Sequence, residues 1–114
     1  MGKLSTHVLD TTHGKPASNL EVKLYKKIED RFELIKEVKT NSDGRCDEPL
    51  LEGQTLEKEG YELVFEVEEY FKKMGTESKL LKDVVIRFYV DDETQNYHIP
   101  LLISPYSYST YQGS

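Results

Sequence analysis

Hydrophobic and polar residues alternate with a period of two through most of this chain, which predicts β-strands. In the segment 19–28, Leu20, Val22 and Leu24 fall on one face of the predicted strand. The segment 31–38 continues the alternation after a short acidic loop, so the pair predicts a hairpin. The same period predicts strands over 4–10, 61–67, 83–91, 97–104 and 107–112.

The alternation is interrupted at two informative places. Over 67–75 the sequence VEEYFKKMG is rich in helix-forming residues and ends at Gly75, which predicts a short helix with a glycine after its last turn. Over 40–45 the sequence TNSDGR predicts a turn in which Gly44 takes a positive φ. About seven or eight short strands and one short helix indicate a mainly β protein, folded as a two-sheet β-sandwich.

Two of the predicted strands have no clean polar face. Over 4–10, Ser5, His7 and Leu9 lie opposite the apolar side, and over 97–104 His98 shares its side with a proline and a leucine. A strand of an ordinary antiparallel sandwich presents one polar face to water. We therefore expect these mixed faces to be covered, either by another subunit or by a ligand.

Composition and charge limit the number of domains and the kinds of partner that the protein can have. The chain has 114 residues, of which 37% are hydrophobic, so we expect one domain over 1–114 with a modest core that favours oligomerisation. The formal net charge of -6 argues against nucleic acid as a partner. We find no membrane span and no secretory segment, and Cys46 alone cannot form an internal disulfide, so we expect a cytoplasmic protein that binds no membrane.

Five residues supply candidate chemistry. His7 and His98 lie on the mixed faces, Arg45 follows the predicted turn, and Tyr111 and Ser114 belong to a hydroxyl-rich C-terminal segment. A base near neutral pH, a permanent cation and hydroxyl donors suit the attack of water on a carbonyl. The alternative is structural, since most strand histidines and tyrosine-rich strands serve packing.

Other kinds of site have less support. His7, Asp10 and His13 lie close together in sequence, but no spacing typical of a metal site accompanies them, so we predict no metal. His13 belongs to a polar turn, where we expect it to be exposed. Cys46 is expected to be an inert thiol.

Three segments in order, LSTHVLDTTHGKPA, DGR and YHIPLLISPYSYSTYQGS, resemble the transthyretin-related protein family, in particular its 5-hydroxyisourate hydrolase branch. The resemblance implies a transthyretin-like two-sheet β-sandwich that assembles as a homotetramer, a dimer of dimers, with active sites in the cleft between dimers. It also implies hydrolytic ring opening of 5-hydroxyisourate, a cyclic amide of urate degradation, with no cofactor.

The resemblance implies a role for each candidate residue. His7, Arg45, His98 and Ser114 correspond to catalytic residues of the family, while His7, Arg45 and Tyr111 are expected to bind the substrate. Which histidine is the general base stays open at this point. No nucleic acid or membrane partner is implied.

Two departures from the family pattern keep an alternative open. Gln112 stands where the terminal motif usually has arginine, and Asn96 stands where the family usually has histidine. The alternative is a transthyretin-like binding protein that carries small aromatic ligands without catalysis. A third possibility is a structural interaction domain. Retention of His7, Arg45 and His98 favours the enzyme.

Overall fold

The computed structural model describes residues 2–113 and builds them mainly from β-strands. Seven strands within these residues have three residues or more: β1 (Lys3–Asp10), β3 (Glu21–Ile28), β4 (Arg31–Lys39), β6 (Gly60–Phe65), β7 (Val84–Tyr89), β8 (Tyr97–Ile103) and β9 (Tyr108–Thr110). The shorter elements are β2 (Lys15–Pro16), β5 (Leu51–Glu52), the 3-10 turn η1 (Gly53–Thr55) and the helix α1 (Val67–Lys73). The predicted mainly β fold with one short helix is confirmed.

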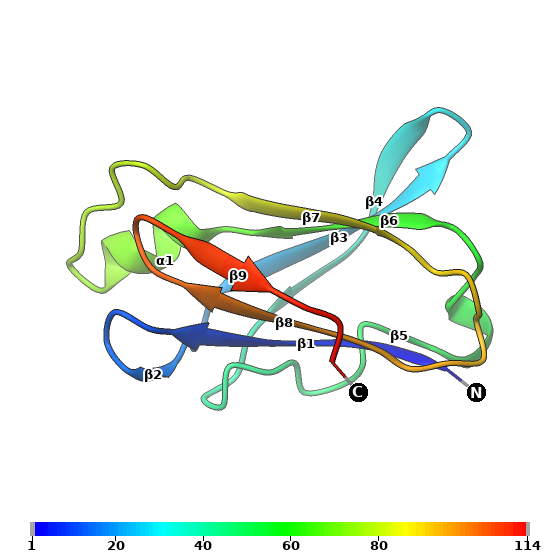
Figure 1. Cartoon of the computed structure of the whole chain (residues 1–114), viewed down its shortest axis with the longest axis horizontal. Helices are drawn as coiled ribbons and strands as arrows, with labels where there is room; N and C mark the ends of the chain where they lie inside the picture. Colours follow the sequence, from blue (N-terminus) through cyan, green and yellow to red (C-terminus); the bar gives the residue numbers. More distant parts are fainter. Residues whose placement is uncertain (1, 114) are drawn as a thin grey trace.

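The strands form two sheets that pack as layers (Figure 1). One sheet has the order β2-β1-β8-β9, with β5 paired to the start of β1, and the other has the order β4-β3-β6-β7. The strands β1 and β8 are parallel, whereas the other pairs are antiparallel. This parallel pairing brings the two predicted mixed faces side by side on one sheet.

The core lies between the sheets and follows the alternation of the sequence. Tyr61, Leu63 and Phe65 on β6 are fully buried, and Val67 continues their face into α1. Burying an aliphatic or aromatic side chain of this size contributes about 1.5–3 kcal/mol. The inward residues of β1 and β8 complete the opposite wall: Leu4, Thr6, Val8, Tyr97, Ile99, Leu101 and Ile103.

The turn at Gly44 is held tightly against β1. Gly44 has a φ of 77°, and a Cβ atom placed on it would lie 2.3 Å from the Val8 carbonyl oxygen. The Val8 N–H also donates to the Gly44 carbonyl at 2.8 Å. Only glycine satisfies both the positive φ and this close approach, so the turn delivers the next residue, Arg45, directly beside β1.

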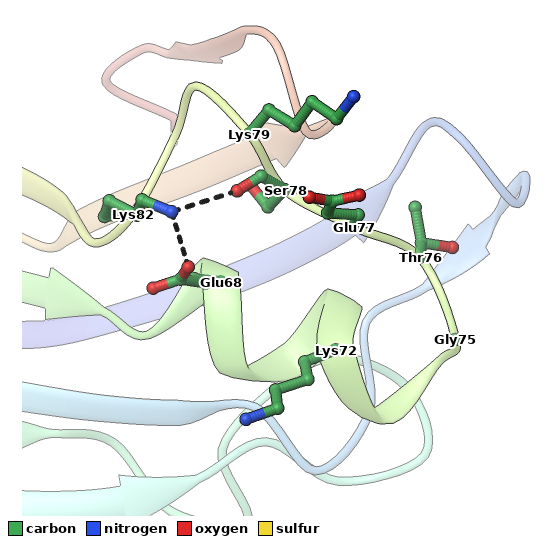
Figure 2. Close-up of a pocket in the computed structure, with 8 residues that line it drawn as sticks. All are labelled: Glu68, Lys72, Gly75, Thr76, Glu77, Ser78, Lys79 and Lys82. Atoms are coloured by element: carbon green, nitrogen blue, oxygen red, sulfur yellow. Dashed lines mark hydrogen bonds and ion pairs between the residues drawn. The ribbon is translucent and has the colours of Figure 1, made fainter.

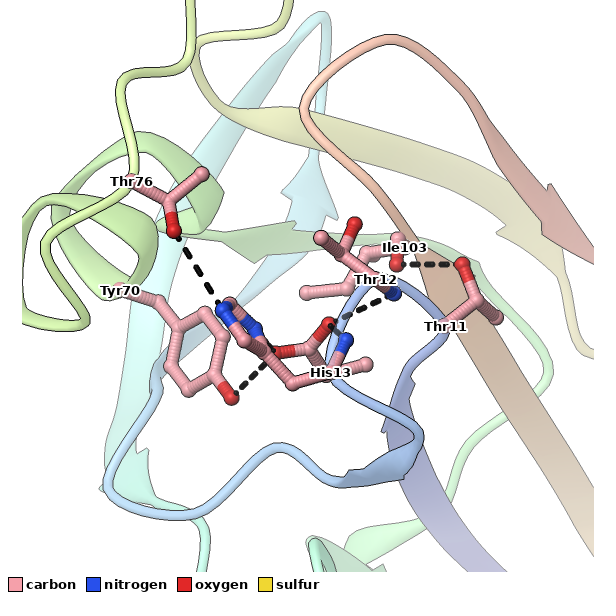
Figure 3. Close-up of polar contacts among 7 residues, drawn as sticks. Thr11, Thr12, His13, Tyr70, Thr76 and Ile103 are labelled. Atoms are coloured by element: carbon pink, nitrogen blue, oxygen red, sulfur yellow. Dashed lines mark hydrogen bonds and ion pairs between the residues drawn. The ribbon is translucent and has the colours of Figure 1, made fainter.

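A buried carboxylate ties the end of β1 to α1 (Figure 3). Asp10 accepts hydrogen bonds from the backbone N–H groups of Thr12 and His13, from His13 Nδ1 at 2.6 Å and from the Tyr70 hydroxyl at 2.8 Å. His13 is exposed, as predicted, but it is paired with Asp10 and its Nε2 lies 3.4 Å from the Thr76 hydroxyl. Asp10 and His13 therefore form a structural network of their own.

Three short elements differ from the expectation drawn from the sequence. β2 and β5 have two residues each, too few to show a period of two. β9 covers Tyr108–Thr110 only, although strand was expected over 107–112. The pairing nevertheless continues past β9, because His98 and Gly113 form an isolated bridge in the same register as β8 and β9.

Candidate active site

His7 and Arg45 are neighbours on the outer face of the β1–β8 sheet. The two residues form an isolated antiparallel bridge, so the segment after Gly44 lies beside β1 at the edge of the sheet. His7 is half-buried and Arg45 is exposed. His7 Nε2 lies 2.9 Å from the Asp43 carbonyl oxygen. Because a carbonyl can only accept, Nε2 carries the proton of this bond, and the lone pair of a neutral His7 is on Nδ1.

His98 lies on the same face, one strand away. It pairs in register with Ser5, and its Nδ1 is 2.8 Å from the Ser5 hydroxyl oxygen. Partial burial lowers the pKa of the His98 imidazole, and the nearby Arg45 cation and His7 lower it further. The lowered pKa favours the neutral form of His98 near pH 7. The pairings of β1 with Arg45 and with β8 bring the three predicted residues His7, Arg45 and His98 together.

The C-terminal segment runs along the other side of β8. In the register of the β8–β9 pair, Tyr111 falls opposite Pro100, on the face that carries His98. The Gly113 N–H donates to the His98 carbonyl at 2.7 Å, which holds this segment to the sheet. Tyr111 is 60% exposed, so its ring is available to a ligand or a partner. Ser114 lies outside the described residues.

The two departures from the family pattern have different positions. In the same register Gln112 falls opposite Ile99, whose side chain points into the sandwich. Gln112 is exposed, and together with Tyr111, Ile86 and Phe88 it lines a groove of about 240 Å³. Asn96 precedes β8, and its Oδ1 accepts a hydrogen bond from the Lys3 N–H at 3.1 Å. The register thus puts Gln112 on the side opposite the histidines, and Asn96 connects the beginning of β1 to the segment before β8.

This arrangement can perform acid–base chemistry on a small polar substrate. His7 presents a lone pair at Nδ1, the pKa of the His98 imidazole is lowered, and the exposed Arg45 guanidinium lies near both. Among residues 2–113 no group of three or more His, Cys, Asp or Glu side chains is placed to hold a metal ion. His13 and Asp10, which are near His7 in sequence, bind each other instead.

Two groups near the site were not predicted from the sequence. They are the Ser5 hydroxyl, bonded to His98, and the Asp43 carbonyl, bonded to His7. Ser5 lies on the predicted mixed face, but its partner depends on the parallel register of β1 and β8. A backbone carbonyl has no signature in the sequence.

A separate cavity of about 550 Å³ lies beside α1 (Figure 2). Its side chains are largely charged and exposed, and Lys82 Nζ donates to Glu68 at 2.6 Å and to the Ser78 carbonyl at 3.3 Å. Of the predicted site residues that the structure describes, none lines it. We therefore assign the candidate active site to the sheet face and not to this cavity.

Comparisons with known proteins agree with the fold just described. The HIUase/Transthyretin family model matches residues 4–113. A 5-hydroxyisourate hydrolase of Ralstonia nicotianae is 48% identical over the full length of both chains. The solved 5-hydroxyisourate hydrolase of Klebsiella pneumoniae is 32% identical over the full length of both chains, with a TM-score of 0.86. Sea bream transthyretin shares the fold, with a TM-score of 0.90 and 24% identity over 97% of this chain and 94% of that chain.

The chain belongs to the HIUase/Transthyretin family. Its curated relatives include several 5-hydroxyisourate hydrolases, so the resemblance to the hydrolase branch is confirmed as well. Within residues 2–113, no helix is long and apolar enough to cross a membrane.

Proposed function

We propose that this protein hydrolyses 5-hydroxyisourate, opening a cyclic amide, as part of urate degradation in the cytoplasm. The observation that carries the proposal is the grouping of His7, Arg45 and His98 on one sheet face, with the pKa of His98 lowered by its surroundings. Relatives that are 46% and 48% identical over the whole of this chain and 93% and 100% of their own length bear the name of this activity, which supports the choice of substrate.

In the proposed reaction, His7 is the general base. Its Nε2–H is engaged by the Asp43 carbonyl, so Nδ1 is the atom that accepts a proton from water. The water oxygen forms a bond to the amide carbon while its proton moves to Nδ1. The C–N bond then breaks, the leaving nitrogen takes the proton back from His7, and the product is a ring-opened carboxylate.

Arg45 and His98 act on the developing negative charge. A tetrahedral intermediate carries an oxyanion, and a guanidinium beside it stabilises that charge. A neutral imidazole can donate a hydrogen bond to the same oxygen without carrying a charge of its own. Arg45 lies beside β1 and His98 lies on β8, and the two are close enough for the Arg45 charge to lower the pKa of His98, so one small substrate could contact both.

We place Tyr111 in substrate binding at the edge of this face, and we assign Ser114, which lies outside the described residues, a catalytic role, as the family resemblance implies. The site of a single chain is open, since Arg45 and Tyr111 are exposed. We therefore propose a homotetramer, a dimer of dimers, in which another subunit closes over the face. Closure removes water and strengthens the electrostatic effect of Arg45 on the reaction.

The test is to generate 5-hydroxyisourate with urate oxidase and to follow its ultraviolet decay with and without the protein. We expect faster decay with the parent, and a loss of kcat/KM of roughly 10²-fold or more for His7→Asn and for Arg45→Ala. Arg31→Ala, on the exposed β3–β4 hairpin, is the matched control and should be as active as the parent.

Two results would contradict the proposal. One is a parent that leaves the spontaneous decay unchanged while binding small aromatic ligands, which favours a carrier without catalysis. The other is a His7→Asn variant that turns over at the parent rate with an unchanged circular dichroism spectrum.

A further inference from the structure

The imidazole of His98 is held on both flanks. On the side of β1, the Ser5 hydroxyl oxygen lies 2.8 Å from Nδ1. On the side of the C-terminal segment, a Cβ atom placed on Gly113 would lie 2.9 Å from His98 Cδ2, so the backbone there stands against the ring. Nδ1 and Cδ2 are the two ring atoms next to Cγ. The ring is therefore fixed between two strands, and its tip with Nε2 is directed away from the backbone.

The direction of the Ser5–His98 hydrogen bond decides what Nε2 can do. A neutral imidazole has one N–H and one lone pair, and its tautomer is set by the partner of the other nitrogen. If Ser5 donates to Nδ1, the proton is on Nε2. If His98 donates to Ser5, Nε2 carries the lone pair and cannot donate to a substrate.

The surroundings of Ser5 favour donation by the serine. Among residues 2–113, Ser5 Oγ has His98 Nδ1 as its one hydrogen-bond partner within the protein. A hydroxyl has a single proton. If Ser5 donates to Nδ1, its proton is used in this hydrogen bond. If Ser5 accepts from Nδ1 instead, the proton of a half-buried hydroxyl has no acceptor among residues 2–113.

We propose that Ser5 is a positioning residue that donates its proton to His98 Nδ1 and thereby keeps the imidazole N–H on Nε2. This inference rests on the proposed function for its consequence in catalysis. His7 and His98 then share one tautomer, protonated at Nε2, but offer different atoms to a substrate. The Nε2–H of His7 is engaged by the Asp43 carbonyl, so His7 presents the lone pair of Nδ1. Nδ1 of His98 is engaged by Ser5, so His98 presents the N–H of Nε2. One imidazole accepts the proton of water while the other holds the carbonyl oxygen, with no proton lost from His98.

The direct test is the ¹⁵N NMR spectrum of the imidazoles, recorded without substrate on the parent, Ser5→Ala and Ser5→Thr. We expect His98 of the parent to be protonated at Nε2 and the signal to shift toward a tautomer mixture in Ser5→Ala. Ser5→Thr retains a hydroxyl and should keep the parent tautomer. Ser18→Ala, at an exposed position outside the sheets, is the control for an unspecific change.

The kinetic test separates positioning from binding. We expect Ser5→Ala to lower kcat by roughly tenfold or more with little change in KM, and Ser5→Thr to restore it, because the hydroxyl acts on the reacting state through His98. A parent His98 protonated at Nδ1, or an unchanged tautomer in Ser5→Ala, would overturn the proposal. A parent that shows the expected tautomers but no hydrolysis would contradict the proposed function and leave the positioning role supported.

Discussion

Individual residues at the site are controlled by neighbours that do not react. The Asp43 carbonyl fixes the tautomer of His7, and partial burial together with the Arg45 guanidinium lowers the pKa of His98. The carbonyl and the guanidinium both come from the segment around Gly44, whereas the burial comes from the packing around His98. A single tight turn therefore influences the protonation of two histidines.

The first prediction concerns the charge of His98. Burial and then Arg45 lower its pKa, so replacing Arg45 by Met, which retains length but no charge, should raise it. The value should stay below the ordinary pKa of histidine, because the burial remains. The measurement is an NMR titration of the His98 ring in the parent and in Arg45→Met. An unchanged or lowered pKa would mean that Arg45 does not act on this ring.

The second prediction concerns Gln112. Because the bridge between His98 and Gly113 keeps the register of β8 and β9, residue 112 falls opposite Ile99 and not on the side of the histidines. We expect an active parent, and we expect Gln112→Arg to change kcat/KM by less than about tenfold, or roughly 1.4 kcal/mol of barrier. Steady-state kinetics of the two proteins provide the check. An inactive parent rescued by this one change would place residue 112 at the substrate.

The sequence singled out His7, Arg45 and His98 because a histidine on a mixed strand face and an arginine after a glycine turn can be recognised from residue type and spacing alone. The structure brings the three together, and their roles in catalysis stay predictions. Ser5 was not singled out, because its role follows from the register of two strands that are far apart in the chain. The register of the bridge at Gly113 agrees with the side that alternation predicts for Gln112, and the effect of this residue on catalysis stays a prediction.

At the scale of elements, the Asp10 network joins three pieces of the fold. The buried Asp10 carboxylate lies at the end of β1. It accepts hydrogen bonds from two backbone N–H groups of the following turn and from the Tyr70 hydroxyl of α1 (Figure 3). Burial and the bond to Asp10 raise the pKa of Tyr70, so its hydroxyl stays protonated and remains a donor. The helix is only seven residues long, too short to be stable by itself, and depends on such contacts.

The third prediction concerns the stability of this network. Burial raises the pKa of Asp10, but the hydrogen bonds from His13 and Tyr70 outweigh it, so the net pKa is lowered. Asp10 therefore stabilises the fold fully above the pKa of an unfolded Asp, and this contribution is lost as the pH falls through the lower folded value. Asp10→Asn should cost about 2 kcal/mol or more at pH 7, because charged hydrogen bonds in a buried site are lost.

Urea unfolding of the parent and Asp10→Asn at several pH values measures this effect. The difference between the two free energies of unfolding should shrink as the pH falls into the acid range. Asp30→Asn, at the exposed turn between β3 and β4, is the matched control and should follow the parent. A constant difference at all pH values would show that packing, and not the charge of Asp10, is responsible.

Strands could be predicted where they were long enough for the alternation of hydrophobic and polar residues to repeat. Strand β6 shows this clearly, since its alternation placed Tyr61, Leu63 and Phe65 inside, and all three are buried. Two-residue strands such as β2 are too short to show this alternation, and they form because the edge of a neighbouring strand is free to pair with them. The network around Asp10 was also unpredictable, since it depends on α1 lying beside the end of β1.

At the scale of the whole molecule, the candidate site is a surface and not a pocket of one chain. The face of β1 and β8 that carries the histidines also carries Leu9 and Leu102, which are paired in register and half-buried. Apolar residues beside polar catalytic groups are typical of a surface that another subunit covers. The mixed faces that were apparent in the sequence thus lie together on one sheet of the structure.

The last prediction concerns the assembly and its link to activity. We expect light scattering to give a mass four times the 13.2 kDa of the chain. Leu102→Glu adds a charge to the face of the histidines without touching His7, Arg45 or His98. If subunits meet over this face, burial of an unpaired charge should break the contact, so that the mass and the rate of hydrolysis fall together. Leu34→Glu, which changes an equally large residue on the exposed side of β4, should alter neither. A parent that is a stable monomer at micromolar concentration, or a Leu102→Glu monomer with full activity, would show that one chain holds a complete site.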